Sequence, residues 1–86
     1  MYKYENLKPG IFTEEGQTLF LEIRDRVKKI LAQSGAVTMG VAMSGTGDSW
    51  KRMACVDRLV ELGELKEIKY GECMGQHRIF VDTKNR

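Results

Sequence analysis

The only histidine, His77, lies four residues after Cys73, and Cys55 precedes both. A thiol beside an imidazole can act as a nucleophile with its base, and both groups bind zinc. Structural zinc sites usually have four ligands, often from cysteines paired at short spacing, and the sequence offers these three separated residues. Nothing in the sequence orients the histidine as a base or supplies an oxyanion site. We therefore expect no metal site, no catalytic cysteine and no enzymatic activity.

Two glycines, Gly40 and Gly45, have the spacing of a phosphate-binding loop. Such a loop has a lysine directly after its second glycine, where the ammonium contacts the phosphates, and Thr46 occupies that position here. No strand clearly precedes the segment either. We therefore expect neither a nucleotide site nor any other cofactor.

The length of 86 residues allows one domain, which buries too little surface to enclose a deep catalytic pocket without a partner. Hydrophobic residues make up 42% and charged residues 30% of the chain, so we expect it to fold around its own core. The sequence has neither the apolar stretch of a secretory signal nor one that spans a bilayer. We therefore expect a cytoplasmic protein without membrane contact, whose two cysteines stay reduced.

The charge balance gives only a weak indication of the partner. Fourteen basic and twelve acidic side chains give a formal net charge of +2, which is small for a nucleic-acid-binding protein. If a polyanion binds, it must be attracted by cations that gather on one face.

A long helix is predicted to begin after Thr13, whose hydroxyl can cap it, and to end at the glycine of Ser34-Gly35. Glu14 and Glu15 suit the positive end of this helix. Its apolar residues recur at helical spacing and define a buried face, which comprises Phe20, Ile23, Val27, Ile30 and Leu31.

Two further helices are expected after it. Thr38 can cap a short helix that reaches Met43, and residues 44–47 form a glycine-rich turn. Asp48 or Thr46 can cap a third helix that runs to about Leu62 and ends at Gly63. The buried side of this third helix is predicted to comprise Trp50, Met53, Val56, Leu59 and Val60.

The remaining segments complete a three-part division of the chain. Residues 65–70 and 77–81 favour two β-strands joined by the glycine-containing turn 71–75. Residues 1–12 are predicted to be an extended lead-in with a turn at Pro9-Gly10, and residues 82–86 to fray. The domain itself is expected to span residues 13–81.

The expected order is three helices followed by a two-stranded C-terminal β-hairpin, and Leu59, Leu62, Gly63 and Leu65 form a Leu-x-x-Leu-Gly-x-Leu pattern. Both features resemble the winged helix-turn-helix superfamily, in which residues 56–65 would include the end of the recognition helix and the start of the wing. The resemblance implies an α+β, winged helix-turn-helix fold. The whole sequence also resembles small uncharacterised proteins of phages and prophages.

The resemblance implies that the third helix enters the major groove of double-stranded DNA while the hairpin contacts the backbone. On a helical wheel Lys51, Arg52, Cys55 and Arg58 share one arc, and Ser49 lies near the helix N-terminus. The polar contacts of the wing would be Lys69, Gln76, His77 and Arg78. The implied function is that of a small DNA-binding regulator, expected to be a homodimer because one short helix reads few base pairs. DNA binding would need a continuous positive strip from the third helix to the hairpin.

Other interpretations remain open. The residues named as contacts could simply form a solvated surface. The expected wing tip, residues 72–74, contains Glu72, Cys73 and Met74 and lacks the cations that a phosphate-binding wing needs. Ala54 and Cys55 would form a small apolar strip on the third helix. These features favour a different function, that of an adaptor which binds a host or phage protein.

Overall fold

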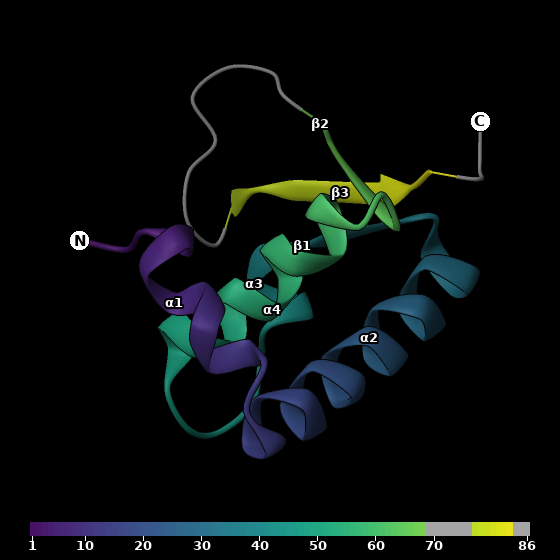
Figure 1. Ribbon diagram of the computed structural model, residues 1–86. Coiled ribbons are helices and arrows are strands. Elements are labelled where there is room, and N and C mark those ends of the chain that lie inside the picture. Colours follow the sequence, from purple (N-terminus) through teal and green to yellow (C-terminus); the bar gives the residue numbers. More distant parts are fainter. Residues whose placement is uncertain (69–76, 84–86) are drawn as a thin grey trace.

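The computed structural model describes residues 1–68 and 77–83, which form an α+β structure with four helices and one three-stranded antiparallel sheet (Figure 1). The helices are α1 (Tyr4–Ile11), α2 (Glu14–Ser34), α3 (Met39–Ala42) and α4 (Ser49–Glu61). The strands are β1 (Ala36–Thr38), β2 (Leu65–Ile68) and β3 (Ile79–Asp82).

The predicted long helix, α2, is confirmed at both ends. The Thr13 hydroxyl accepts a hydrogen bond from the Gly16 amide at 3.0 Å, which satisfies one of the free donors of the first turn. Gly35 ends the helix with φ +79°, a conformation that favours glycine. Of the predicted buried face, Ile30 is partly buried, and the buried residues are Phe20, Ile23, Val27 and Leu31.

The two helices after β1 also begin at predicted caps. The Thr38 hydroxyl accepts from the Val41 amide at 3.3 Å, and the Asp48 carboxylate accepts from the Trp50 and Lys51 amides at 3.0 and 3.3 Å. Asp48 is therefore the N-cap of α4, as one of the two predicted alternatives stated. Gly63 follows the end of α4 with φ +79°.

The sheet has one strand more than the sequence predicted. Strands β2 and β3 pair as an antiparallel hairpin, but β1 also pairs with β3, so the order is β1-β3-β2. Val37 of β1 lies opposite Phe80, and both side chains are buried. The two-stranded prediction was wrong because a three-residue strand is too short to give an alternating pattern. The predicted turn at 71–75 lies outside the described residues.

The prediction of an extended lead-in over residues 1–12 was also wrong, because residues 4–11 form α1. Pro9 and Gly10 lie inside this helix and do not form a turn. Tyr4, Leu7 and Ile11 have helical spacing, and α1 packs with this side toward α2 and α4. An eight-residue helix is unstable alone, so this packing stabilises α1.

The junction between α1 and α2 is unusually close at Gly16. A Cβ atom at this position would lie 2.0 Å from the Gly10 carbonyl oxygen and 2.7 Å from the Ile11 Cα. Only glycine lets the two backbones approach in this way.

The C-terminal strand extends beyond its predicted end at residue 81. Asp82 belongs to β3, and the Thr83 hydroxyl donates to the Gly63 carbonyl at 2.9 Å. The prediction that fraying begins at residue 82 was therefore wrong, and residues 84–86 lie outside the described part.

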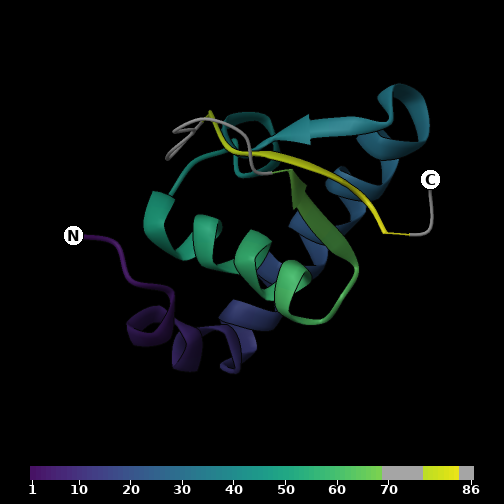
Figure 2. The same ribbon diagram turned by 90° about the horizontal axis from the view of Figure 1, so that it is seen from above.

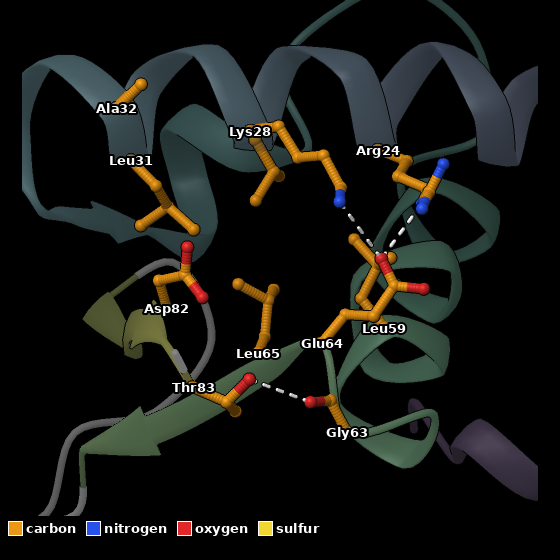
Figure 3. A pocket seen from close by; sticks show the side chains of 11 residues that line it. Arg24, Lys28, Leu31, Ala32, Leu59, Gly63, Glu64, Leu65, Asp82 and Thr83 are labelled. Atoms are coloured by element: carbon orange, nitrogen blue, oxygen red, sulfur yellow. Dashed lines mark hydrogen bonds and ion pairs between the residues drawn. The ribbon is translucent and has the colours of Figure 1, made fainter. Parts of the chain in front are cut away.

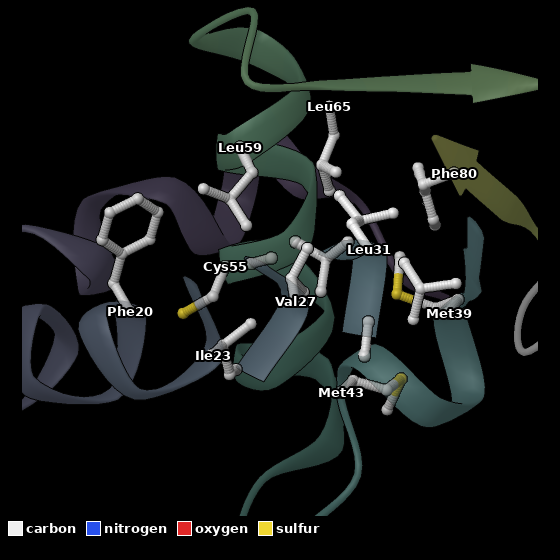
Figure 4. Packing of buried hydrophobic residues seen from close by; sticks show 14 of the residues in the cluster. Phe20, Ile23, Val27, Leu31, Met39, Met43, Cys55, Leu59, Leu65 and Phe80 are labelled. Carbon is white, nitrogen blue, oxygen red and sulfur yellow. The ribbon is translucent and has the colours of Figure 1, made fainter. Parts of the chain in front are cut away.

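The hydrophobic core lies between α2, α4 and the inner face of the sheet (Figure 4). Ile11 adds α1 to the same core, since its side chain is fully buried. Residues from the segment 1–12 therefore pack into the same core as the helices and strands that follow. Of the helices in the described residues, none is both long and apolar enough to cross a bilayer.

Candidate functional site

The helix predicted to recognise a partner, α4, is covered by three neighbours. Figure 2 shows α4 between α1 and the sheet, and α2 also packs against it. Only a narrow arc of α4 faces outward, so the orientation of each side chain decides which residues can meet a partner.

Arg52, predicted to be exposed, is only 5% exposed, so that prediction was wrong. Its guanidinium donates to the carbonyl oxygens of Met43 and Ser44 at 2.7 and 2.6 Å, and to that of Thr46 at 3.3 Å. It also pairs with Glu22 at 3.1 Å. Loop carbonyls that turn inward need donors, and Arg52 supplies them. This arginine fastens the loop between α3 and α4 and is not free to contact DNA.

Cys55 and Ala54 were predicted to form an exposed strip, and both are fully buried. The prediction was wrong because α1 and α2 pack against this part of α4. Burial also raises the pKa of the Cys55 thiol to about 11, so the thiol stays protonated at neutral pH and is unsuited to metal binding or nucleophilic attack. Cys73 lies outside the described residues, and those described hold no cluster of three metal-ligating side chains.

The other two cations of α4 lie near the junction between α1 and α2. Arg58 donates to Glu61 at 2.9 Å, and its guanidinium carbon lies 5.0 Å from the centre of the Phe12 ring. Lys51 lines a shallow hollow with Thr13 and Glu14 at the start of α2. Lys51 makes no ion pair within residues 1–68 and 77–83.

Ser49, predicted to contact a phosphate, is exposed at the start of α4. However, the Asp48 carboxylate already accepts hydrogen bonds from the free amides of this turn. A fixed negative charge at this place opposes a phosphate, although a bare helix N-terminus would attract one.

Trp50 was predicted to be buried and is 44% exposed. The inward position in the first turn of α4 is taken by Arg52, so the helix is rotated relative to the prediction. The Trp50 ring meets the Tyr2 ring edge-on, with 6.3 Å between their centres and 71° between their planes. Such T-shaped pairs are favourable, so each ring helps to hold the other.

Arg78, the residue directly before β3, was predicted to contact DNA as part of the wing. Its guanidinium instead forms ion pairs with Asp57 of α4 at 2.7 Å and with Glu67 of β2 at 2.9 Å. Hydrogen bonds to Glu67 and Asp57 raise the pKa of Arg78 above its ordinary value, because both stabilise the charged form. Arg78 therefore ties the hairpin to α4, with its charge balanced by two carboxylates.

The N-terminal segment is tied to α4 by two tyrosines. The Tyr2 hydroxyl donates to Asp57 at 2.5 Å, and the Tyr4 hydroxyl donates to Glu61 at 2.6 Å. Burial, and then the hydrogen bond to the carboxylate, raise the pKa of each phenol above its ordinary value.

Glu61 collects three donors. Besides the Tyr4 hydroxyl, it accepts from Lys8 at 2.8 Å and from Arg58 at 2.9 Å. Hydrogen bonds from Lys8, Tyr4 and Arg58, in this order of size, lower the pKa of Glu61 to about 2. This carboxylate is therefore charged at any physiological pH and holds α1 against α4.

The continuous positive strip needed for DNA binding does not form among the described residues. Arg52 is buried, Arg58 is paired with Glu61, and Arg78 is paired with Asp57. His77 is exposed, and Lys69 and Gln76 lie outside the described residues.

The sequence interpretation missed the importance of Tyr2, Tyr4, Trp50 and Asp57. The spacing of Tyr4, Leu7 and Ile11 was the signal that could have revealed α1, and with α1 the covered side of α4 would have been apparent.

Comparison of the chain with models of protein families, with curated proteins and with solved structures finds no match.

Proposed function

We propose that residues 14–82 form a winged helix domain, and that the outward arc of α4, together with the N-terminal residue Tyr2 that packs on it, binds another protein. The resemblance depended on an order of three helices followed by a hairpin. This order is present from α2 to β3, with the additional strand β1 after α2 and the additional helix α1 before it. We call the binding region the Trp50 surface, and it consists of Tyr2, Trp50, Asp57 and Glu61.

The observation that carries this proposal is the composition of the outward arc of α4. Its large exposed side chain is Trp50, and its acidic residues, Asp57 and Glu61, are ion-paired with Arg78 and Arg58. Aromatic residues are enriched at protein interfaces and supply most of the affinity there, whereas DNA contact requires cations that are free to meet phosphates. The arc therefore suits a protein partner better than a duplex.

The Trp50 surface is also ordered before a partner arrives. Tyr2 is fixed by its hydrogen bond to Asp57, and Trp50 rests edge-on against Tyr2. Binding then immobilises few additional side chains, which lowers the entropic cost of association. The partner suited to this surface presents an apolar side chain to the Trp50 and Tyr2 rings and a Lys or Arg that stacks on an indole face.

Photo-crosslinking tests the proposal directly. A photoreactive amino acid replaces Trp50, and a matched variant carries it at Leu21, which is 53% exposed on α2. We expect one discrete protein adduct in native cells from position 50 and none from position 21. We also expect Trp50→Ala, but not Leu21→Ala, to weaken binding of the captured protein at least about tenfold, as truncation of a central interface aromatic does. Equal adducts from both positions, or no loss with Trp50→Ala, would refute this assignment.

Double-stranded DNA is the second candidate partner, favoured by the element order from α2 to β3. In this case the protein is a small regulator that binds DNA as a homodimer. Lys51→Ala and Arg58→Ala would reduce the affinity for a labelled duplex and flatten its dependence on salt. Arg52→Ala cannot serve in this test because Arg52 holds the fold. Tight, salt-dependent binding together with a DNA adduct at position 50 would replace the protein proposal by this one.

A further inference from the structure

A pocket of about 420 Å³ opens at the end of α4 opposite to Trp50 (Figure 3). It lies where α2, the turn after α4 and the end of β3 meet. Its volume falls within the range of about 300 to 1,000 Å³ that is typical of small-molecule sites. No part of the Trp50 surface lines it, so the pocket has to be considered separately.

The floor of the pocket is aliphatic. It consists of Val27, Leu31, Leu59 and Leu65, which belong to the core and are at most 7% exposed. Water over such a floor forms no hydrogen bonds with it, so an apolar group that replaces this water gains free energy. The floor therefore favours a ligand with a hydrocarbon portion.

The α2 wall of the pocket carries two cations that share one carboxylate. The Arg24 Nε donates to Glu64 Oε1 at 2.8 Å, and the Lys28 ammonium lies 3.6 Å from the same oxygen. Hydrogen bonding from Arg24 holds the pKa of Glu64 below its usual value, so Glu64 is charged. The two terminal amino groups of Arg24 donate to no other described residue. One positive charge and a planar pair of donors thus remain available on this wall.

The opposite side of the pocket is formed by Asp82 and Thr83 at the end of β3. The basic residues among those that line the pocket are Arg24 and Lys28, and their donors match the geometry of a carboxylate.

We propose that this pocket binds an amphipathic carboxylate, whose hydrocarbon chain lies on the Leu31 and Leu65 floor while its carboxylate contacts Arg24 and Lys28. This inference does not depend on the proposed partner of the Trp50 surface. The ligand class follows from one apolar floor next to one wall with a surplus of positive charge.

The test uses octanoate as the probe and follows the methyl resonances of Leu31 and Leu65 by NMR. We expect saturable shifts at these methyls, with octan-1-ol and octylammonium at least about tenfold weaker because neither forms the charge-assisted hydrogen bonds to Arg24. Octylammonium that binds as tightly as octanoate would overturn the proposal. So would an apparent Kd for octanoate weaker than about 10 mM.

Two variants with a matched control locate the site. Arg24→Gln is expected to weaken octanoate binding about tenfold, whereas Lys29→Gln, which removes the same charge from another side of α2, leaves it unchanged. Ala32→Trp places a large side chain at the exposed mouth and is expected to abolish binding without altering the core. Equal binding to the wild type and to both pocket variants would show that the probe binds elsewhere. Trp50→Ala should leave octanoate binding unchanged. The test of the pocket is therefore independent of the test of the protein-binding proposal.

Discussion

Replacing Arg52 by alanine gives the sharpest test of the packing around α4. The substitution removes donors from the carbonyl oxygens of Met43, Ser44 and Thr46. A hydrogen bond from a charged donor contributes about 1.5 to 3 kcal/mol, so three of them would give at most about 9 kcal/mol. Water can reach the carbonyls of the exposed loop residues Ser44 and Thr46, and the expected loss of unfolding free energy is therefore about 3 to 5 kcal/mol.

The partner carboxylate contributes much less to this effect. The Glu22 side chain is 54% exposed, so its ion pair with Arg52 is screened by solvent. Glu22→Gln should therefore cost less than about 1 kcal/mol. Arg52→Lys keeps the charge, but the lysine cannot reach all three carbonyls. Its loss of unfolding free energy should therefore fall between the losses for Glu22→Gln and Arg52→Ala.

Urea unfolding, followed by circular dichroism, measures the unfolding free energy of all three variants, and thermal unfolding measures their melting temperatures. In a domain of this size, each kcal/mol shifts the melting temperature by about 4 to 8 °C, so Arg52→Ala should melt at least about 12 °C below the wild type. A loss below about 1 kcal/mol would refute the reasoning. If Arg52→Ala instead weakened DNA binding while stability stayed unchanged, Arg52 would be the DNA contact that the sequence suggested.

Three further predictions follow from the junctions of the fold. Gly16→Ala should cost at least about 2 kcal/mol in urea unfolding because its Cβ would meet backbone atoms, whereas Gly10→Ala, with 3.9 Å to its nearest neighbour, should be tolerated. Because the pKa of Glu61 is lowered to about 2, its stabilising contribution is complete above the ordinary carboxylate pKa and is lost as the pH falls through about 2. Unfolding midpoints should therefore fall with acid, and less steeply in Glu61→Gln. In a Cys73→Ser background, Cys55 should react with a thiol reagent far more slowly when folded than in urea, and equal rates would contradict its burial.

The sequence predicted well those elements whose signals are local. The starts of α2, α3 and α4 follow from their N-caps, Thr13, Thr38 and Asp48, and each cap acts through amides within a few residues. By contrast, α1 depends on contacts with residues more than forty positions away, as the bonds from Tyr2 and Tyr4 to α4 demonstrate. Local propensity at Pro9-Gly10 favoured a turn, and tertiary packing overrode it.

Helix α4 itself was predicted from the sequence, but the prediction of which of its residues are exposed was wrong for Trp50 and Arg52. The general preference for buried tryptophan and exposed arginine placed Trp50 inside and Arg52 outside. The loop before α4 reverses both positions, because its inward carbonyls need a cationic donor and Tyr2 offers Trp50 a partner ring at the surface. Neither requirement can be recognised before the path of the loop and of the N-terminal segment is known.

The position of α1 also limits what α4 can enter. A single helix is about 10 to 12 Å wide and fits a major groove of about 12 Å, but two helices packed about 8 to 10 Å apart do not. Full insertion of α4 into DNA would therefore require α1 to leave its place and break the Tyr4 and Lys8 bonds to Glu61. Hydrogen exchange in residues 4–11 should then increase when a duplex is added. A protein that packs on the Trp50 surface should instead slow exchange there, because Tyr2 and Trp50 would be covered with α1 still in place.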